Sequence, residues 1–77
     1  MTTRDVPRLL ALAEERIARA NLFLRRQRAV IESLRAEGRV TTDASAVLFD
    51  AERLQAGFIA ERNQLRQELE RMTWMTR

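Results

Sequence analysis

Apolar residues recur along the first half of the chain at alternating intervals of three and four positions. This spacing is typical of an α-helix whose apolar stripe repeats about every 3.5 residues, as in coiled coils. A second stripe with similar spacing follows Gly38. The first stripe consists of Leu10, Ala13, Ile17, Ala20, Leu24, Gln27, Ile31 and Leu34, and the second of Val47, Ala51, Leu54, Phe58, Arg62, Leu65, Leu69 and Met72.

Residues with capping preferences mark the ends of both helices. Asp5 is suited to an N-cap and Pro7 to a first turn, because the first N–H groups of a helix have no partner within it. Gly38 can adopt the left-handed conformation that ends a helix, and Thr41 or Thr42 can cap the next one. We therefore predict one domain over 1–77, with a first helix at about 5–37, a turn at 38–41, a second helix at about 42–72 and a frayed tail at 73–77.

A turn this short predicts an all-α fold, in which two helices form an antiparallel hairpin that resembles a coiled coil. If the numbers of facing positions add up to about 82, nearly all apolar residues fall into matching layers, and the polar exceptions match as well. The register predicted in this way pairs Leu34 with Leu48, Leu24 with Phe58, Leu10 with Met72, Gln27 with Gln55 and Ala20 with Arg62.

The apolar face of each helix is wider than one hairpin can cover. A chain of this length buries only a modest core, and without cysteine it has no disulfide to compensate. Two hairpins packed as a four-helix bundle would cover more of the apolar surface. We therefore predict a homodimer whose self-association involves Leu9, Phe23, Val30, Leu48 and Ile59.

Four further apolar residues point away from the predicted contact between the helices. Single exposed apolar side chains are normal on proteins, so these four could have no partner. The alternative is a second contact surface for an unidentified protein, because two of the four are aromatic. These residues are Leu12, Leu22, Phe49 and Trp74.

The residue types that usually carry catalysis and metal binding are missing from the sequence. The chain has no histidine, cysteine, tyrosine or lysine, which removes the common nucleophiles, bases and soft metal ligands. Glu61 and Glu68 lie seven positions apart, but ion pairs with nearby arginines are a simpler explanation for them than a metal site. We predict a protein that is not an enzyme, with no catalytic residue, metal site or cofactor.

All fourteen basic residues are arginine, and with eleven acidic residues the net charge is +3. The excess lies in the first helix, where Arg19, Arg25 and Arg26 form a candidate basic patch. A solvated outer face explains this cluster best, although an acidic protein or a phosphate backbone could also bind it. No aromatic residue interleaves the arginines except Phe23, so base stacking has no support.

The longest apolar run covers only residues 9–13, far fewer than the roughly 20 residues that span a bilayer. Charged residues follow this run directly, which is not the pattern of a signal peptide. We therefore predict a cytoplasmic protein without a membrane segment.

Segments 16–19, 27–38, 41–44 and 47–48 resemble a group of short alphaproteobacterial hypothetical proteins of unknown function. Those proteins share an R-x-x-I, Q-R-x-x-I-x-x-L, G-x-x-T-x-x-A-x-x-L-L style of pattern, and the resemblance covers roughly residues 13–65. It implies a helical hairpin but no activity or site. The sequence departs from the group at Val40, where Asp is frequent, and at Glu61, where His is frequent.

Taken together, these patterns favour a non-enzymatic protein-interaction or accessory module that self-associates through its apolar helix faces. The alternative is a small regulatory protein that binds nucleic acid through the arginine face of the first helix.

Overall fold

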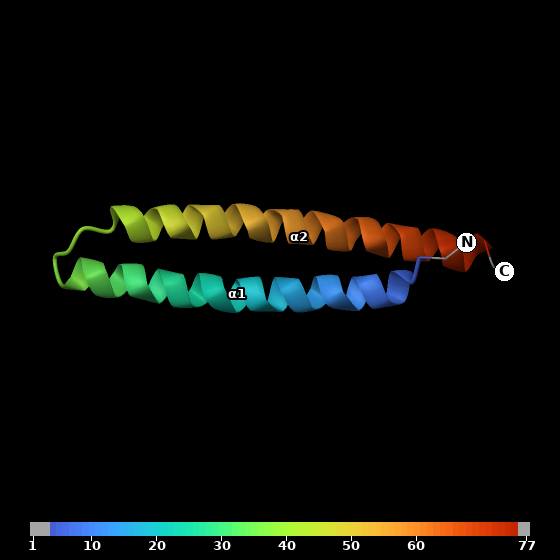
Figure 1. Ribbon diagram of the computed structural model, residues 1–77, viewed down its shortest axis with the longest axis horizontal. Helices are drawn as coiled ribbons and strands as arrows, with labels where there is room; N and C mark the ends of the chain where they lie inside the picture. The colour runs from blue at the N-terminus through green and yellow to red at the C-terminus, as the bar shows by residue number, and fades with distance from the viewer. Residues whose placement is uncertain (1–3, 76–77) are drawn as a thin grey trace.

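The computed structural model describes residues 4–75, which form two long helices packed side by side (Figure 1). Helix α1 spans Val6–Ala36 and helix α2 spans Thr42–Met75. Residues 37–41 join them, so the helices run antiparallel and form a helical hairpin, as the sequence predicted.

The residues at the helix ends act as their types suggest. The side chain of Asp5 accepts a hydrogen bond from the backbone N–H of Arg8 at 3.2 Å, which caps α1. Gly38 has φ of 70°, and the next residue, Arg39, donates its N–H to the carbonyl of Leu34 at 2.8 Å. This left-handed glycine ends α1 and turns the chain back toward the first helix.

Helix α2 extends further than its apolar pattern indicates. We expected it to end near Met72 and the tail to fray, but the helix continues to Met75. Thr73 donates its hydroxyl to the carbonyl of Leu69 at 3.0 Å within this last part. Helical hydrogen bonds run within one segment, so the backbone stays helical where the apolar stripe no longer meets α1. Residues 76–77 of the expected tail lie outside the described residues.

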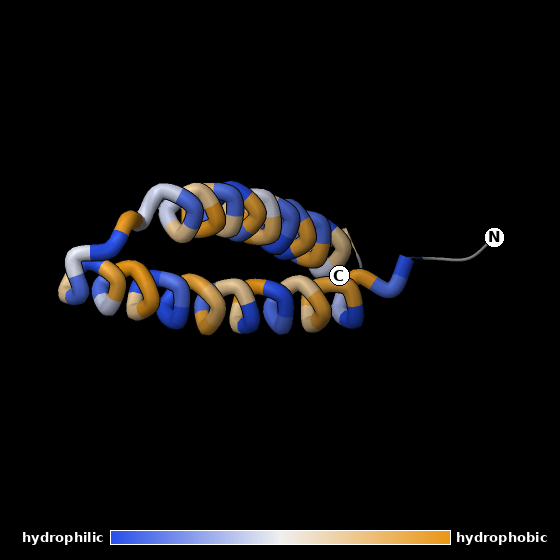
Figure 2. The backbone as a smooth tube through the Cα atoms, turned by 60° about the vertical axis from the view of Figure 1, so that its left-hand side comes forward, coloured by the Kyte–Doolittle hydropathy of each residue, from blue (hydrophilic) through white to orange (hydrophobic). Residues whose placement is uncertain are grey.

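The face of α1 that packs against α2 is the one that the sequence predicted. Its most buried residues are spaced at the intervals of the apolar stripe, and the coloured tube in Figure 2 shows apolar positions recurring along both helices. These buried residues are Val6, Ala13, Ile17, Leu24 and Ile31.

The first half of α2 presents a different face from the one expected. Val47 and Leu54 were assigned to the contact with α1, but 44% and 62% of their surfaces are exposed. The positions that face α1 instead keep the alternating spacing of three and four along the whole helix. These partly or fully buried residues are Ala44, Leu48, Ala51, Gln55, Phe58, Arg62, Leu65 and Leu69.

The expected register was also wrong, by about one heptad. Leu10 belongs to one core cluster with Leu65 and Leu69, whereas we expected it to face Met72. Farther along, the Gln55 amide donates a hydrogen bond to the side chain of Asn21 and does not face Gln27.

The cause of this shift is the turn. Gln27 donates instead to the carbonyl of Ala44 at 2.9 Å, close to the start of α2. Leu48 lines a surface hollow together with Ile31, whereas we expected it to face Leu34. The apolar pattern repeats every seven residues, so it matches itself equally well in both registers.

Arg62 lies among the residues that face α1, but its charged end has partners. Its side chain is 21% exposed, and a guanidinium nitrogen lies 3.6 Å from a carboxylate oxygen of Glu14 on α1. Its Nε also donates to the side chain of Asn63 at 3.0 Å. Glu14 has a second partner, Arg66, at 3.0 Å. The sequence left Glu61, a partner chain or solvent as alternatives for the charged end of Arg62, but Glu61 pairs with Arg16.

The molecule is a thin rod of 61 × 19 × 15 Å. Its radius of gyration of 17.8 Å exceeds the roughly 11 Å expected of a compact chain of this length. Neither helix contains, within the described residues, a stretch that is apolar and long enough to cross a membrane.

The register can be tested with pairs of cysteines. We expect Leu24→Cys with Ala51→Cys to form an intrachain disulfide under mild oxidation, because these positions face each other in the observed register. Leu24→Cys with Phe58→Cys is the control, since position 58 lies about 10 Å farther along the rod. Peptide mapping by mass spectrometry distinguishes the two. Preferential linkage of 24 to 58 would show that the helices pair as the apolar pattern alone suggested.

The contribution of Arg62 can be tested by Arg62→Leu. We expect this substitution to stabilise the protein by about 1 to 2 kcal/mol, because it makes the apolar layer continuous while Glu14 keeps Arg66 as its partner. Thermal unfolding followed by circular dichroism at fixed protein concentration measures the effect. The matched control Arg66→Leu removes the shorter, more exposed ion pair and should change stability by less than about 1 kcal/mol. A clear loss of stability in Arg62→Leu would contradict this account.

Candidate protein-interaction surface

One side of the hairpin carries large apolar side chains from both helices at its edge, and we call it the apolar flank. It consists of Phe23 and Val30 on α1 and of Val47 and Leu54 on α2. Each pair is separated by seven positions, so its members lie two turns apart in one column of their helix. Between 44% and 62% of each of these four residues is exposed.

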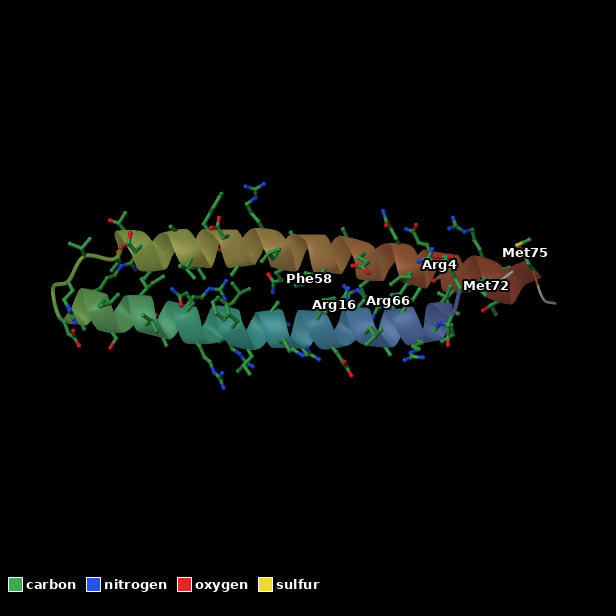
Figure 3. All side chains as sticks on the ribbon, viewed as in Figure 1. Arg4, Arg16, Phe58, Arg66, Met72 and Met75 are labelled. Carbon is green, nitrogen blue, oxygen red and sulfur yellow. The ribbon has the colours of Figure 1, made fainter. Side chains whose placement is uncertain are left out.

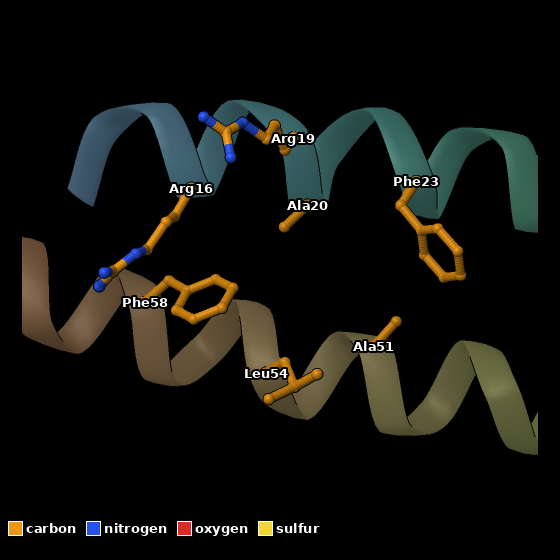
Figure 4. A pocket seen from close by; sticks show the side chains of 7 residues that line it. All are labelled: Arg16, Arg19, Ala20, Phe23, Ala51, Leu54 and Phe58. Carbon is orange, nitrogen blue, oxygen red and sulfur yellow. The ribbon is translucent and has the colours of Figure 1, made fainter. Parts of the chain in front are cut away.

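A hollow of about 400 Å³ lies between the two helices on this flank (Figure 4). Ala20 and Ala51 are small, so the helices leave space between them that no side chain of the hairpin fills. Figure 4 shows Phe23 at one end of this space and Phe58 near the other. Five of the seven lining residues are apolar, and the full set is Arg16, Arg19, Ala20, Phe23, Ala51, Leu54 and Phe58.

An ion pair bounds the apolar flank toward the chain ends. Arg16 on α1 lies 3.6 Å from Glu61 on α2, and both side chains are about half exposed. These two residues occupy the same columns as Phe23 and Leu54, seven positions away in each helix. Figure 3 shows Arg16 and Phe58 in the space between the two helices. The apolar flank is therefore a limited patch with charged residues at one end.

The opposite side of the hairpin, the polar flank, is covered by interactions between the helices. Polar side chains stand here at the positions that correspond to the apolar residues of the other flank. The pairs that cross between the helices are Asn21 with Gln55, Arg28 with Glu52 at 3.9 Å, and Glu14 with Arg66 at 3.0 Å. Polar pairs therefore join the two helices on the polar flank, whereas exposed apolar side chains predominate on the other.

The residues predicted for self-association are only partly brought together. Phe23 and Val30 lie on the apolar flank and are each 47% exposed. Leu9 occupies the same column of α1 beyond Arg16, where it packs against the core near the chain ends. The other two lie elsewhere: Leu48 faces α1, and Ile59 is on the polar flank, midway between Glu52 and Arg66.

The four residues predicted for a second partner do not form one surface. They are exposed, but Leu12 and Leu22 lie on different columns of α1. Phe49 and Trp74 are about 37 Å apart along α2. No single patch contains Leu12, Leu22, Phe49 and Trp74.

The predicted basic patch is divided between the two flanks. Arg19 pairs with Glu15 at 3.4 Å and lines the hollow of the apolar flank. Arg26 lies in the same column of α1 as Arg19, seven positions on. Arg25 lines a separate, polar hollow on the other flank.

The two glutamates considered as metal ligands each pair with an arginine. Glu61 pairs with Arg16, and Glu68 lies 3.1 Å from Arg4. Within the described part of the chain, no group of three or more acidic side chains is placed to hold a metal ion.

Sequence reasoning missed Val47 and Leu54 as surface residues. Both fit the apolar stripe of α2 as well as their neighbours do, and we placed them against α1. Ala44 and Gln55 face α1 in the structure, but they are less apolar than Val47 and Leu54, so the apolar pattern did not identify them as contact residues. The length of the turn was the available sign that α2 starts facing α1 from its first residues.

Comparison of the chain with protein-family models, curated proteins and solved structures gives no match. The resemblance to short alphaproteobacterial proteins is not tested by these comparisons and stays a prediction.

Proposed function

We propose that this protein is a non-enzymatic interaction module that self-associates through the apolar flank. The observation that carries the proposal is the contrast between the two flanks. Hydrogen bonds and ion pairs cross the polar flank, while Phe23 and Leu54 line a hollow on the apolar flank. Val30 and Val47 continue the same columns and are about half exposed. A second copy would give these side chains the contacts that one hairpin lacks.

The area of the molecule supports this proposal. The chain exposes 6352 Å², whereas a compact monomer of 9.0 kDa exposes roughly 4,900 Å². The excess of about 1,500 Å² is larger than the roughly 800 Å² that each partner buries in a standard interface. A hairpin dimer could therefore form while leaving much of each rod uncovered.

Burial of the apolar flank in a dimer also contributes favourable free energy. Complete burial of a large apolar side chain contributes about 1.5 to 3 kcal/mol, and the four flank residues are each about half exposed. In a two-fold dimer each of these residues is buried in both copies, so its contribution to the free energy of association doubles. The total is comparable with the roughly 4 to 15 kcal/mol that association costs. The flank residues alone thus offset the cost, and the remaining area of a standard interface has to supply the net affinity. We expect a dimer at micromolar concentrations, with the four helices packed as a bundle.

The alternative of nucleic-acid binding has less support. Arg19 is engaged with Glu15, and Arg25 lies on a different flank from Arg26. A phosphate backbone binds most strongly where several cations share one face.

Self-association is tested by sedimentation equilibrium of the unmodified protein and two variants. We expect a dimer for the unmodified chain at micromolar concentration and a weakened dimer for Leu54→Glu, because a charge would enter the apolar contact. The matched control is Phe49→Glu on the same helix. Phe49 is 60% exposed but lies away from the flank, so this variant should remain a dimer. A well-folded monomer of the unmodified protein at high micromolar concentration would contradict the proposal.

Nucleic-acid binding is tested by titration with duplex DNA at two salt concentrations. We expect no binding at about 50 mM salt, because the arginines of α1 are divided between faces and partly paired. Tight binding that weakens steeply as salt increases would favour the alternative instead.

A further inference from the structure

Two charged residues of opposite sign border the apolar flank, one on each helix. Arg26 follows Phe23 by three positions and precedes Val30 by four, so it lies beside both on α1. Asp50 is placed in the same way between Val47 and Leu54 on α2, and it lines a small surface hollow together with Arg53 and Leu54. Both charged side chains are exposed.

Both charges lack an ion-pair partner among the described residues of the hairpin. In the described part of the chain, the ion pairs involve other residues, and neither Arg26 nor Asp50 takes part in one. The two residues do lie at about the same level along the rod, between the Asn21–Gln55 and Gln27–Ala44 hydrogen bonds. The outer edge of the apolar flank therefore carries the cation Arg26 on α1 and the anion Asp50 on α2, neither of which has an ion-pair partner among the described residues.

We propose that the second copy docks on the apolar flank with its α2 against α1 of the first, about a two-fold axis parallel to the rod. The inference rests on the proposed self-association and specifies its geometry. A rotation about such an axis exchanges the two helices but keeps every residue at its level along the rod. Arg26 then meets Asp50 of the second copy, and the same contact forms a second time.

The apolar residues match in this arrangement as well. Phe23 lies over Leu54 of the second copy and Val30 over its Val47, which closes the hollow from above. At the end of the flank, Arg16 lies over Glu61 of the second copy. Together with the ion pair that already joins Arg16 and Glu61 within each chain, this contact places charges of alternating sign at four corners.

Gly57 also has a place in this arrangement. It lies in the same column of α2 as Asp50, and a Cβ built on it would meet nothing within 4 Å inside the hairpin. Packing within one chain therefore does not require glycine here. In the proposed dimer Arg19 of one copy lies at the level of Gly57 of the other, where the missing side chain leaves room for the arginine.

The competing arrangement has its two-fold axis across the rod, so that α1 packs on α1 and α2 on α2. The edge that carries Arg26 then faces the same edge of the second copy. The edge that carries Asp50 likewise faces its own counterpart. Like charges that face each other across an interface oppose association, whereas opposite charges favour it and fix the register. Charge complementarity therefore favours the contact between α1 and α2.

Charge reversal distinguishes the two arrangements. Arg26→Glu and Asp50→Arg should each weaken the dimer about tenfold in sedimentation equilibrium, because each creates two contacts between like charges. An equimolar mixture of the two variants should restore the affinity to within about threefold of the unmodified protein, since both contacts then join opposite charges. Arg25→Glu on the polar flank makes the same change in charge and should leave affinity unchanged.

The possible outcomes separate this inference from the proposal beneath it. A monomeric unmodified protein would overturn both. An unmodified dimer whose affinity does not fall in either single variant, or is not restored in the mixture, would overturn only the arrangement. Both reversed residues are exposed, so circular dichroism should show unchanged helix content in each variant.

A cysteine experiment gives a second, independent measurement. Chains with Phe23→Cys and chains with Leu54→Cys, mixed and oxidised, should form mainly the mixed disulfide dimer. Predominant linkage of Phe23→Cys chains to one another would favour the arrangement with α1 on α1 and overturn the inference.

Discussion

The short connection between the helices determines which side chains of this molecule meet. Only residues 37–41 lie between Ala36 and Thr42, and the left-handed Gly38 reverses the chain within them. Helix α2 must therefore face α1 from its first turn. There the carbonyl of Ala44 accepts a hydrogen bond from the side-chain amide of Gln27. Every later contact follows from this starting point, including the core near the chain ends and the composition of both flanks.

The sequence was sufficient to predict the two helices, their caps and the contact face of α1, because these depend on local residue types and on periodicity. It was not sufficient for the register. A stripe that repeats every seven residues superimposes on itself after a shift of one heptad, so Leu24 matched Phe58 as well as Ala51. Apolar character alone then assigned Val47 and Leu54 to the contact with α1, and only the packed structure shows them at its edge.

Of the candidate site, the sequence predicted the residues on α1 but not those on α2. Phe23 and Val30 were recognised because they lie beside the apolar stripe of α1, whose position was predicted correctly. Val47 and Leu54 on α2 were not recognised, because the sequence assigned them to the stripe that contacts α1. The difference between the flanks was beyond sequence reasoning, since it depends on pairs such as Glu14 with Arg66 that lie 52 positions apart. Such pairs become visible only when the register is known. A pattern therefore predicts contacts within a helix more reliably than contacts across a hairpin.

Helix α1 buries residues along the whole rod, including Leu24 and Ile31, but the one fully buried residue in the described part of α2, Leu65, lies toward the chain ends, which gives the rod two ends of unequal local stability. Val6, Ala13 and Leu65 are almost fully buried near the chain ends, and the partly buried Leu10 and Leu69 pack against them. At the middle and toward the turn, α2 contributes alanines, a glutamine and partly exposed side chains. Local opening requires little free energy where few apolar contacts are lost. Amide protons near the turn should thus exchange with solvent through small openings, while those around Leu65 exchange only when the two helices separate.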